Sequence, residues 1–208
     1  MENDLEHTTS EDPNRTRATL IQRVKDPRDE SSWEDFAQIY SGYVYGIIRR
    51  MNISESDAED LVQQLLLIMW NKLPKTDVEQ IRSFRAWLST ITKNFVTDFI
   101  RKRVRETKRL KKAAQDTSMI YLKSIRLPEI DQIAEKEWKL HLTNLALGNI
   151  ESLFSGHAIE VFRLSLAGQD IKQISNQLGL QENSVYRLRN RVKKRLVQEV
   201  RYLRQELE

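Results

Sequence analysis

The stretch Ile171-Lys-Gln-Ile-Ser-Asn-Gln-Leu-Gly-Leu-Gln-Glu-Asn-Ser-Val-Tyr-Arg-Leu188 decides how the C-terminal part of this chain folds. Ile171, Ile174 and Leu178 recur at helical spacing and predict one apolar helix face. Gly179 follows, and glycine adopts the positive φ of a tight turn at little cost. We expect Leu180 to fill the corner before a second helix begins near residue 182. The pattern predicts a helix-turn-helix; an ordinary helical hairpin joined at glycine is the alternative interpretation.

The second helix of this motif has one apolar and one polar face. Its inward face is expected to be formed by Val185, Leu188, Val192 and Leu196. Polar side chains that point away from that face can hydrogen-bond base edges or phosphates in a DNA groove. The candidate DNA-contacting residues on this helix are Asn183, Ser184, Tyr186, Arg187, Asn190, Arg191 and Lys194.

The composition of all 208 residues favours helices and gives no sign of catalysis. Six glycines and four prolines are few for this length, so breakers are scarce. There is no cysteine, which excludes disulfides and thiol chemistry. The three histidines are far apart and form no metal-ligand spacing, and no glycine-rich phosphate loop is present. We therefore expect a protein that is not an enzyme and binds no metal or cofactor.

Charge is distributed unevenly along the chain, although the formal net charge is only +4. Residues 1–12 carry five acids and no Lys or Arg, whereas residues 101–112 and 186–204 each carry eight bases against one acid. Two basic blocks far apart in sequence predict two contacts with one polyanion. Each block could instead be a solvated helix face.

Helical periodicity elsewhere predicts an all-α fold of two small domains. Long helices are expected from Trp33 to Ile48, from Ser54 to about Leu73 and from Ser83 to Arg105, with Ser54 and Asp57 as a capping box. Further helices are expected around 131–148, 151–167, 170–178 and 182–205. The resulting division is a disordered acidic tail (1–16), a first domain (17–105), a flexible linker (106–130) and a second domain (131–208).

The third helix combines an aromatic face with a polar, basic one. Six apolar residues fall on one face at 100° per residue: Phe84, Trp87, Leu88, Ile91, Phe95 and Phe99. The neighbouring face carries Thr90, Lys93, Asn94, Thr97 and Arg101. Trp87 lies at the edge of the apolar face, where it could stack on an unpaired base or simply pack.

Three motifs in order resemble the sigma-70 family of transcription initiation factors, and most closely its short extracytoplasmic-function (ECF) class. They are Ser56-Asp-Ala-Glu-Asp-Leu-Val-Gln63, followed by Trp70; Ser83-Phe-Arg-Ala-Trp-Leu88, with Asn94 and Asp98 ahead of Arg101-Lys-Arg103; and the helix-turn-helix. The resemblance covers about residues 17–110, as the family's second region, and 131–205, as its fourth. Many members have Glu where this chain has Gln64, next to a run of three leucines.

The resemblance implies roles for matching residues. Asp57, Asp60 and Gln63 fall on the surface that docks on RNA polymerase core enzyme. Trp87, Asn94, Thr97 and Arg101 fall in the segment that opens and reads the −10 promoter element, and Thr90 and Lys93 share their polar face. Residues 182–194 match the helix that reads the −35 element. The implied partners are core polymerase and promoter DNA, and an anti-sigma factor is left open.

Two other interpretations use part of the same evidence. A helix-turn-helix regulator with an unrelated helical domain would explain the second domain but not the Asp-Ala-Glu-Asp-Leu-Val-Gln helix. A protein-interaction module that sequesters a regulator is a third interpretation. The acidic amino terminus is no signal peptide, and no run of 18 apolar residues exists, so we expect a cytoplasmic protein with no membrane insertion.

Overall fold

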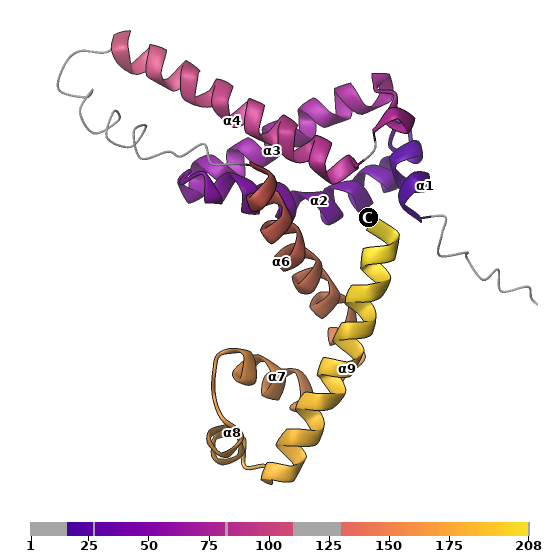
Figure 1. Ribbon diagram of the computed structural model, residues 1–208, viewed down its shortest axis with the longest axis vertical. Coiled ribbons are helices and arrows are strands. Elements are labelled where there is room, and N and C mark those ends of the chain that lie inside the picture. The colour runs from indigo at the N-terminus through magenta and orange to yellow at the C-terminus, as the bar shows by residue number, and fades with distance from the viewer. Residues whose placement is uncertain (1–15, 27, 82, 110–129, 208) are drawn as a thin grey trace, which may run out of the picture.

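The computed structural model describes residues 16–26, 28–81, 83–109 and 130–207, and within these ranges it contains helices and no β-strand (Figure 1). The all-α prediction is therefore confirmed. The predicted tail (1–16) and linker (106–130) fall largely outside the described residues. The helices are α1 (Thr16–Arg23), α2 (Glu30–Arg50), α3 (Glu55–Lys72), η2 (Leu73–Lys75), η3 (Val78–Gln80), α4 (Phe84–Arg109), α6 (Ile130–Glu151), α7 (Ala158–Leu166), α8 (Ile171–Leu178) and α9 (Glu182–Leu207).

Helices α1 to α4 assemble around an aromatic and aliphatic core. Local sequence sets where they begin: the Asp29 side chain accepts a hydrogen bond from the Ser32 amide at 3.0 Å, and Ser54 accepts one from the Asp57 amide at 3.3 Å. Such side-chain acceptors satisfy amides that have no partner inside the helix. Ser54 is confirmed as the N-cap of α3, by its own side-chain hydrogen bond with the Asp57 amide, and α3 ends in the short 3₁₀ turn that contains Pro74.

The buried face of α4 is rotated relative to the predicted aromatic face. The fully buried positions are Phe84, Leu88, Ser89, Thr92 and Val96, whereas Trp87, Ile91, Phe95 and Phe99 are only half-buried. The hydroxyls of Ser89 and Thr92 donate to the carbonyls of Ala86 and Leu88, each at 2.8 Å. These backbone hydrogen bonds let polar residues enter the core without an unsatisfied donor.

Helices α7, α8 and the start of α9 form the predicted helix-turn-helix around a small core of Val161, Ile174 and Val185. Gly179 has φ 65°, in the left-handed region, and ends α8. Leu180 packs against the small core, as expected of the corner residue. The helix predicted from residue 151 begins only at Ala158, because α6 runs on to Glu151 and a turn with Gly156 at φ 63° follows.

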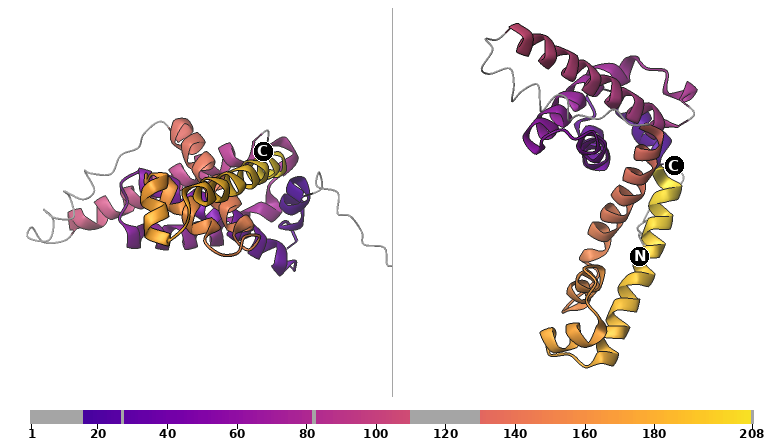
Figure 2. Two further views of the ribbon diagram at one scale, coloured as in Figure 1. Left: turned by 90° about the horizontal axis from the view of Figure 1, so that it is seen from below. Right: turned by 60° about the vertical axis from the view of Figure 1, so that its left-hand side comes forward.

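Helices α6 and α9 run side by side and connect the two ends of the molecule (Figures 1 and 2). The first half of α6 packs on α2 and α4, and the last turns of α9 pack on α1. Trp138 of α6 is fully buried against Tyr40 and Tyr43 of α2, with ring centroids 6.2 and 5.1 Å away. The helix-turn-helix lies at the far end from α2, α3 and α4.

The cap of α8 yields a stability prediction. The Asp170 carboxylate accepts from the Gln173 amide at 2.8 Å, and the Gln173 side chain accepts from the Asp170 amide at 2.9 Å. Loss of such a cap costs about 1 kcal/mol. We expect Asp170→Ala to lower the free energy of unfolding in urea by about that amount. Asp170→Asn keeps an acceptor and should unfold like the parent; equal loss in both variants would contradict this role of the cap.

Candidate nucleic-acid and protein interfaces

The first candidate surface is the solvent-facing side of α3. Asp60 and Gln63 are exposed there, one turn apart. Asp57 differs, because its carboxylate lies 3.0 Å from the guanidinium of Arg103 on α4 and its side chain is only 17% exposed. The structure therefore presents Asp60 and Gln63 to solvent, whereas Asp57 joins α3 to α4.

Two apolar residues on the exposed side of α3 were not singled out from the sequence. Leu67 is 67% exposed and Ile68 is 40% exposed. Leu67 lies one turn beyond Gln63 and Gln64, which are both exposed. Contiguous apolar surface of this kind is common where proteins bind each other. The run of three leucines was the available signal, but periodicity alone does not separate the buried Leu65 from the exposed Leu67.

The second candidate surface is the polar stripe of α4. Thr90, Asn94 and Arg101 are exposed, and Lys93 and Thr97 are half-buried. Both threonine hydroxyls donate to backbone carbonyls of the preceding turn, at 2.9 Å for Thr90 and 2.8 Å for Thr97. Arg101 lies 3.3 Å from the exposed carboxylate of Asp98. The stripe is accessible to a ligand. The ion pair of Arg101 with Asp98 holds the arginine only weakly, because exposed ion pairs contribute little to stability.

Trp87 and Arg85 flank this stripe at the start of α4. Trp87 is half-buried and its ring lies 5.3 Å from that of Phe84. Arg85 is held by α6: its guanidinium lies 3.1 Å from the Glu135 carboxylate and 5.9 Å from the centre of the Trp138 ring. Sequence reasoning did not single out Arg85, since its partners lie about 50 residues further along the chain.

The third candidate surface is the start of α9. Five of the seven predicted residues are exposed, and Ser184 and Asn190 are half-buried: Asn183, Tyr186, Arg187, Arg191 and Lys194 are the exposed ones. Val185 and Val192 are fully buried, and Leu196 is 8% exposed. The predicted inward and outward faces of this helix are therefore confirmed, and they give one basic, accessible face at the end of the molecule.

Two arginines of α9 lie over aromatic rings. The guanidinium of Arg191 lies 5.2 Å from the centre of the Phe154 ring, which belongs to the turn between α6 and α7. That of Arg189 lies 5.6 Å from the Tyr186 ring. A guanidinium over a ring keeps its N–H edges available for a phosphate or base. These contacts restrict the rotamers of Arg191 and Arg189 before any ligand binds.

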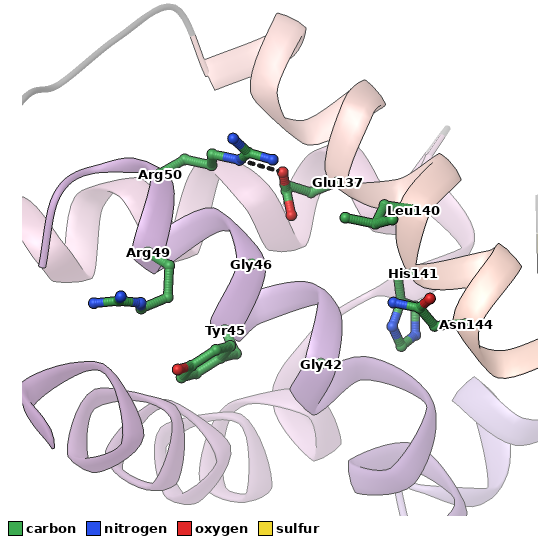
Figure 3. Close-up of a pocket in the computed structure, with 9 residues that line it drawn as sticks. All are labelled: Gly42, Tyr45, Gly46, Arg49, Arg50, Glu137, Leu140, His141 and Asn144. Atoms are coloured by element: carbon green, nitrogen blue, oxygen red, sulfur yellow. Dashed lines mark hydrogen bonds and ion pairs between the residues drawn. The ribbon is translucent and has the colours of Figure 1, made fainter. Parts of the chain in front are cut away.

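A groove of about 580 Å³ lies between α2 and α6 (Figure 3). It is bordered by Arg50 and Glu137, which form an ion pair at 2.5 Å, and by His141, whose Nε2 hydrogen-bonds the Ile39 carbonyl. Burial lowers the pKa of His141, opposed by that hydrogen bond. Burial also raises the pKa of the neighbouring Tyr43 to about 12, so its hydroxyl stays a donor, here to the Arg85 carbonyl at 3.4 Å.

The part of the chain that the structure describes contains no cluster of three or more His, Cys, Asp or Glu side chains able to hold a metal ion. Among the same residues, no helix is long and apolar enough to cross a membrane.

Comparison with known proteins relates the segment that contains α3 and most of α2 and α4 to a known family. Residues 36–106 match the family described as sigma-70 region 2. The chain is also similar to the ECF RNA polymerase sigma factor RpoE of Cereibacter sphaeroides, with 28% identity over 83 residues, which are 40% of this chain and 45% of that protein. The chain therefore spans less than half of the length of this curated relative. No solved structure matches the chain at comparable significance.

The bundle of α2, α3 and α4 with its exposed polar stripe is thus a sigma-70 region 2. Residues 36–106 thus match the sigma-70 family's region 2, and the relative to which the chain is similar is a sigma factor of the ECF type.

The half-buried imidazole of His141 gives a pH prediction. Because the folded state lowers the pKa of His141, the unfolded chain takes up a proton more readily as the pH falls through about 6.5. The free energy of unfolding should therefore fall between about pH 7 and pH 5. His141→Gln should flatten that slope in urea titrations. Asp29, whose pKa is lowered to about 2, acts only at lower pH; an unchanged slope in His141→Gln would refute the assignment.

Proposed function

We propose that this protein is an RNA polymerase sigma factor that directs promoter recognition, DNA melting and transcription initiation. The observation that carries the proposal is the region 2 match over residues 36–106, combined with a basic helix-turn-helix at the other end of the molecule. Opening a duplex needs positioning rather than covalent chemistry from the protein, so the proposed function requires no catalytic group. Such a protein works in the cytoplasm, which is the location that we propose.

Core polymerase is the proposed partner of α3. Asp60 and Gln63 are exposed on one side of this helix, and Leu67 continues the same surface. Carboxylates at the rim and an apolar centre form a common protein interface. Asp57 was predicted for this surface as well; its ion pair with Arg103 supports a role in fixing α3 against α4 while docking occurs.

Promoter DNA is the proposed ligand of α9 and α4. The exposed face of residues 182–194 is suited to duplex base edges, because a single helix fits the major groove. The stripe Thr90, Lys93, Asn94, Thr97 and Arg101 is suited to the −10 strand as it separates, with Trp87 beside it. Flipping one base costs a few kcal/mol, which contacts in a pocket can offset.

The alternative function is a helix-turn-helix regulator that does not act as a sigma factor. The basic face of α9 fits both functions, whereas the exposed side of α3 favours the first. In vitro transcription separates them: core polymerase plus this chain should start at a defined promoter selected from a random library. A chain that binds DNA but gives no transcript without another sigma factor would be the regulator. Whether an anti-sigma factor binds stays a prediction of the family resemblance.

The docking surface on α3 can be tested by charge reversal. Asp60→Lys places a cation on an exposed position, so folding should be nearly unchanged. Binding to core polymerase should weaken by an order of magnitude or more, because a charge that meets a like charge across an interface costs about 2 kcal/mol or more. Asp35→Lys, at an exposed position of α2, is the matched control. Equal co-purification of both variants with core would remove α3 from the interface.

The division of labour between α9 and α4 gives a second test. Arg187→Ala should weaken binding to closed duplex with the −35 element by about 1–3 kcal/mol and relax specificity at one position. Asn94→Ala should leave duplex binding intact but reduce permanganate reactivity of unpaired thymines near −10. Lys172→Ala, at an exposed position of α8, is the control. Normal melting by Asn94→Ala together with normal −35 binding by Arg187→Ala would overturn the division.

A further inference from the structure

Arg191 lies in a row of bases along the outward side of α9. Arg187, Arg191 and Lys194 follow one another at steps of four and three residues, so they share one helix face, and all three are exposed. In the part of the chain that the structure describes, Arg191 is the only one of the three that lies over an aromatic ring: its guanidinium is 5.2 Å from the centre of the Phe154 ring. The row therefore contains one base whose position a ring fixes.

Phe154 belongs to a turn between α6 and α7 whose backbone is defined by its own hydrogen bonds. The Phe154 amide donates to the Glu151 carbonyl at 3.2 Å, and the amide before it donates to the Ile150 carbonyl at 3.0 Å. Gly156, at φ 63°, lets the chain turn into α7. The Phe154 ring is half-buried and packs against the main hydrophobic core. The ring is therefore a fixed platform on the side of α9.

The helix that carries Arg191 is fixed to the end of α6 from which this turn starts. The Glu199 carboxylate accepts a hydrogen bond from the Asn149 side chain of α6 at 3.0 Å and lies 3.1 Å from the Arg195 guanidinium. Glu199 is only 7% exposed, so these partners satisfy a carboxylate that water barely reaches. Val192, next to Arg191, is fully buried. The fold thus sets the distance between the ring and the guanidinium.

A guanidinium that rests on a ring is well suited to binding DNA. Its five N–H donors lie in one plane, so a ring that covers the face of the group leaves the donors at its edges accessible. An arginine without such a platform loses rotamer freedom when it binds, which weakens its contribution to affinity. The attraction between a cation and a ring also strengthens when water is removed, as happens under a bound duplex.

We propose that Phe154 is a positioning residue for DNA binding: its ring holds Arg191 in the rotamer that contacts the duplex. Phe154 acts through Arg191 and needs no contact with DNA of its own. The inference rests on DNA binding by the outward face of α9, which is part of the proposed function and also of the alternative, a regulator. It adds a residue that precedes the helix-turn-helix to those that set its affinity for DNA.

The first experiment measures whether the ring holds Arg191 in the free chain. Full-length protein made with isotopically labelled arginine gives a nuclear magnetic resonance signal for each Nε–H group, and the signal of Arg191 is the one that Arg191→Lys removes. The ring current of Phe154 should shift this proton upfield. Phe154→Leu should therefore move the signal downfield, whereas Phe154→Tyr should leave it near the parent's position. An unmoved signal in Phe154→Leu would overturn the proposal.

The second experiment measures what the ring contributes to affinity. The probe is a fluorescent DNA duplex that the full-length parent selects from a random library, titrated at one fixed salt concentration. Phe154→Leu keeps an apolar side chain but removes the aromatic face, and it should raise Kd about three- to tenfold, as expected when one long side chain must be ordered on binding. Phe154→Tyr restores the face and should bind like the parent. Leu153→Ala, at the exposed neighbouring position of the same turn, is the matched control.

A double-mutant cycle separates positioning from a general loss of structure. In the Arg191→Ala chain the ring has no guanidinium to hold, so adding Phe154→Leu should raise Kd no further. Phe154→Met, which fills a similar volume, gives the same test if the leucine variant folds poorly.

Three results of the titrations would overturn the proposal. They are an equal loss from Phe154→Leu with and without Arg191, an unchanged or lower Kd for Phe154→Leu alone, and a parent chain that binds no duplex. In vitro transcription gives a separate answer, because a chain that drives no transcript with core polymerase fails as a sigma factor, whereas these Kd values test Phe154 in a sigma factor and in a regulator alike.

Discussion

The insertion of Trp138 between Tyr40, Tyr43 and Arg85 is the contact on which the arrangement of this molecule depends. Burial of one large aromatic side chain stabilises by several kcal/mol at most, but this ring also fixes how α6 crosses α2 and α4. The close approach requires glycine at two positions of α2, because a Cβ there would meet Glu137 or His141. Since α9 packs along α6, the position of the helix-turn-helix follows from this one crossing.

Much of the fold can be predicted from local sequence because its signals are local. The helix-turn-helix depends on the left-handed turn at Gly179, the cap at Asp170 and the apolar spacing of α8 and α9, all within about 30 residues. The buried face of α4 is harder to predict, because a pattern of apolar residues treats Ser89 and Thr92 as exposed. Their hydroxyls donate hydrogen bonds to carbonyls of the preceding turn instead. Because these hydroxyls are satisfied, Ser89 and Thr92 lie in the core, and the buried face of α4 is rotated away from the predicted aromatic face.

The candidate sites are predictable only as far as helix faces are. The outward residues of α9 follow from its period, and the structure exposes most of them. The pairing of Asp57 with Arg103 spans 46 residues, and that of Arg85 with Glu135 spans 50, so neither follows from spacing along one helix. Asp57 and Arg85 lie in motifs that the sequence shows clearly, but their ion-pair partners are seen only in the tertiary structure. The Phe154 ring under Arg191 is a further example of a contact between distant parts of the chain.

The continuity of α9 has a mechanical consequence. A single helix of 26 residues is about 39 Å long, and it runs without a break from Glu182, beside the turn, to Leu207. Leu203 and Leu207 belong to the same hydrophobic core as Leu20 and Ile21 of α1. Because the helix is unbroken, a tilt imposed on its first turns by any bound partner also moves its last turns. Strain applied at one end of the protein is therefore felt at α1, a long way from where it arose.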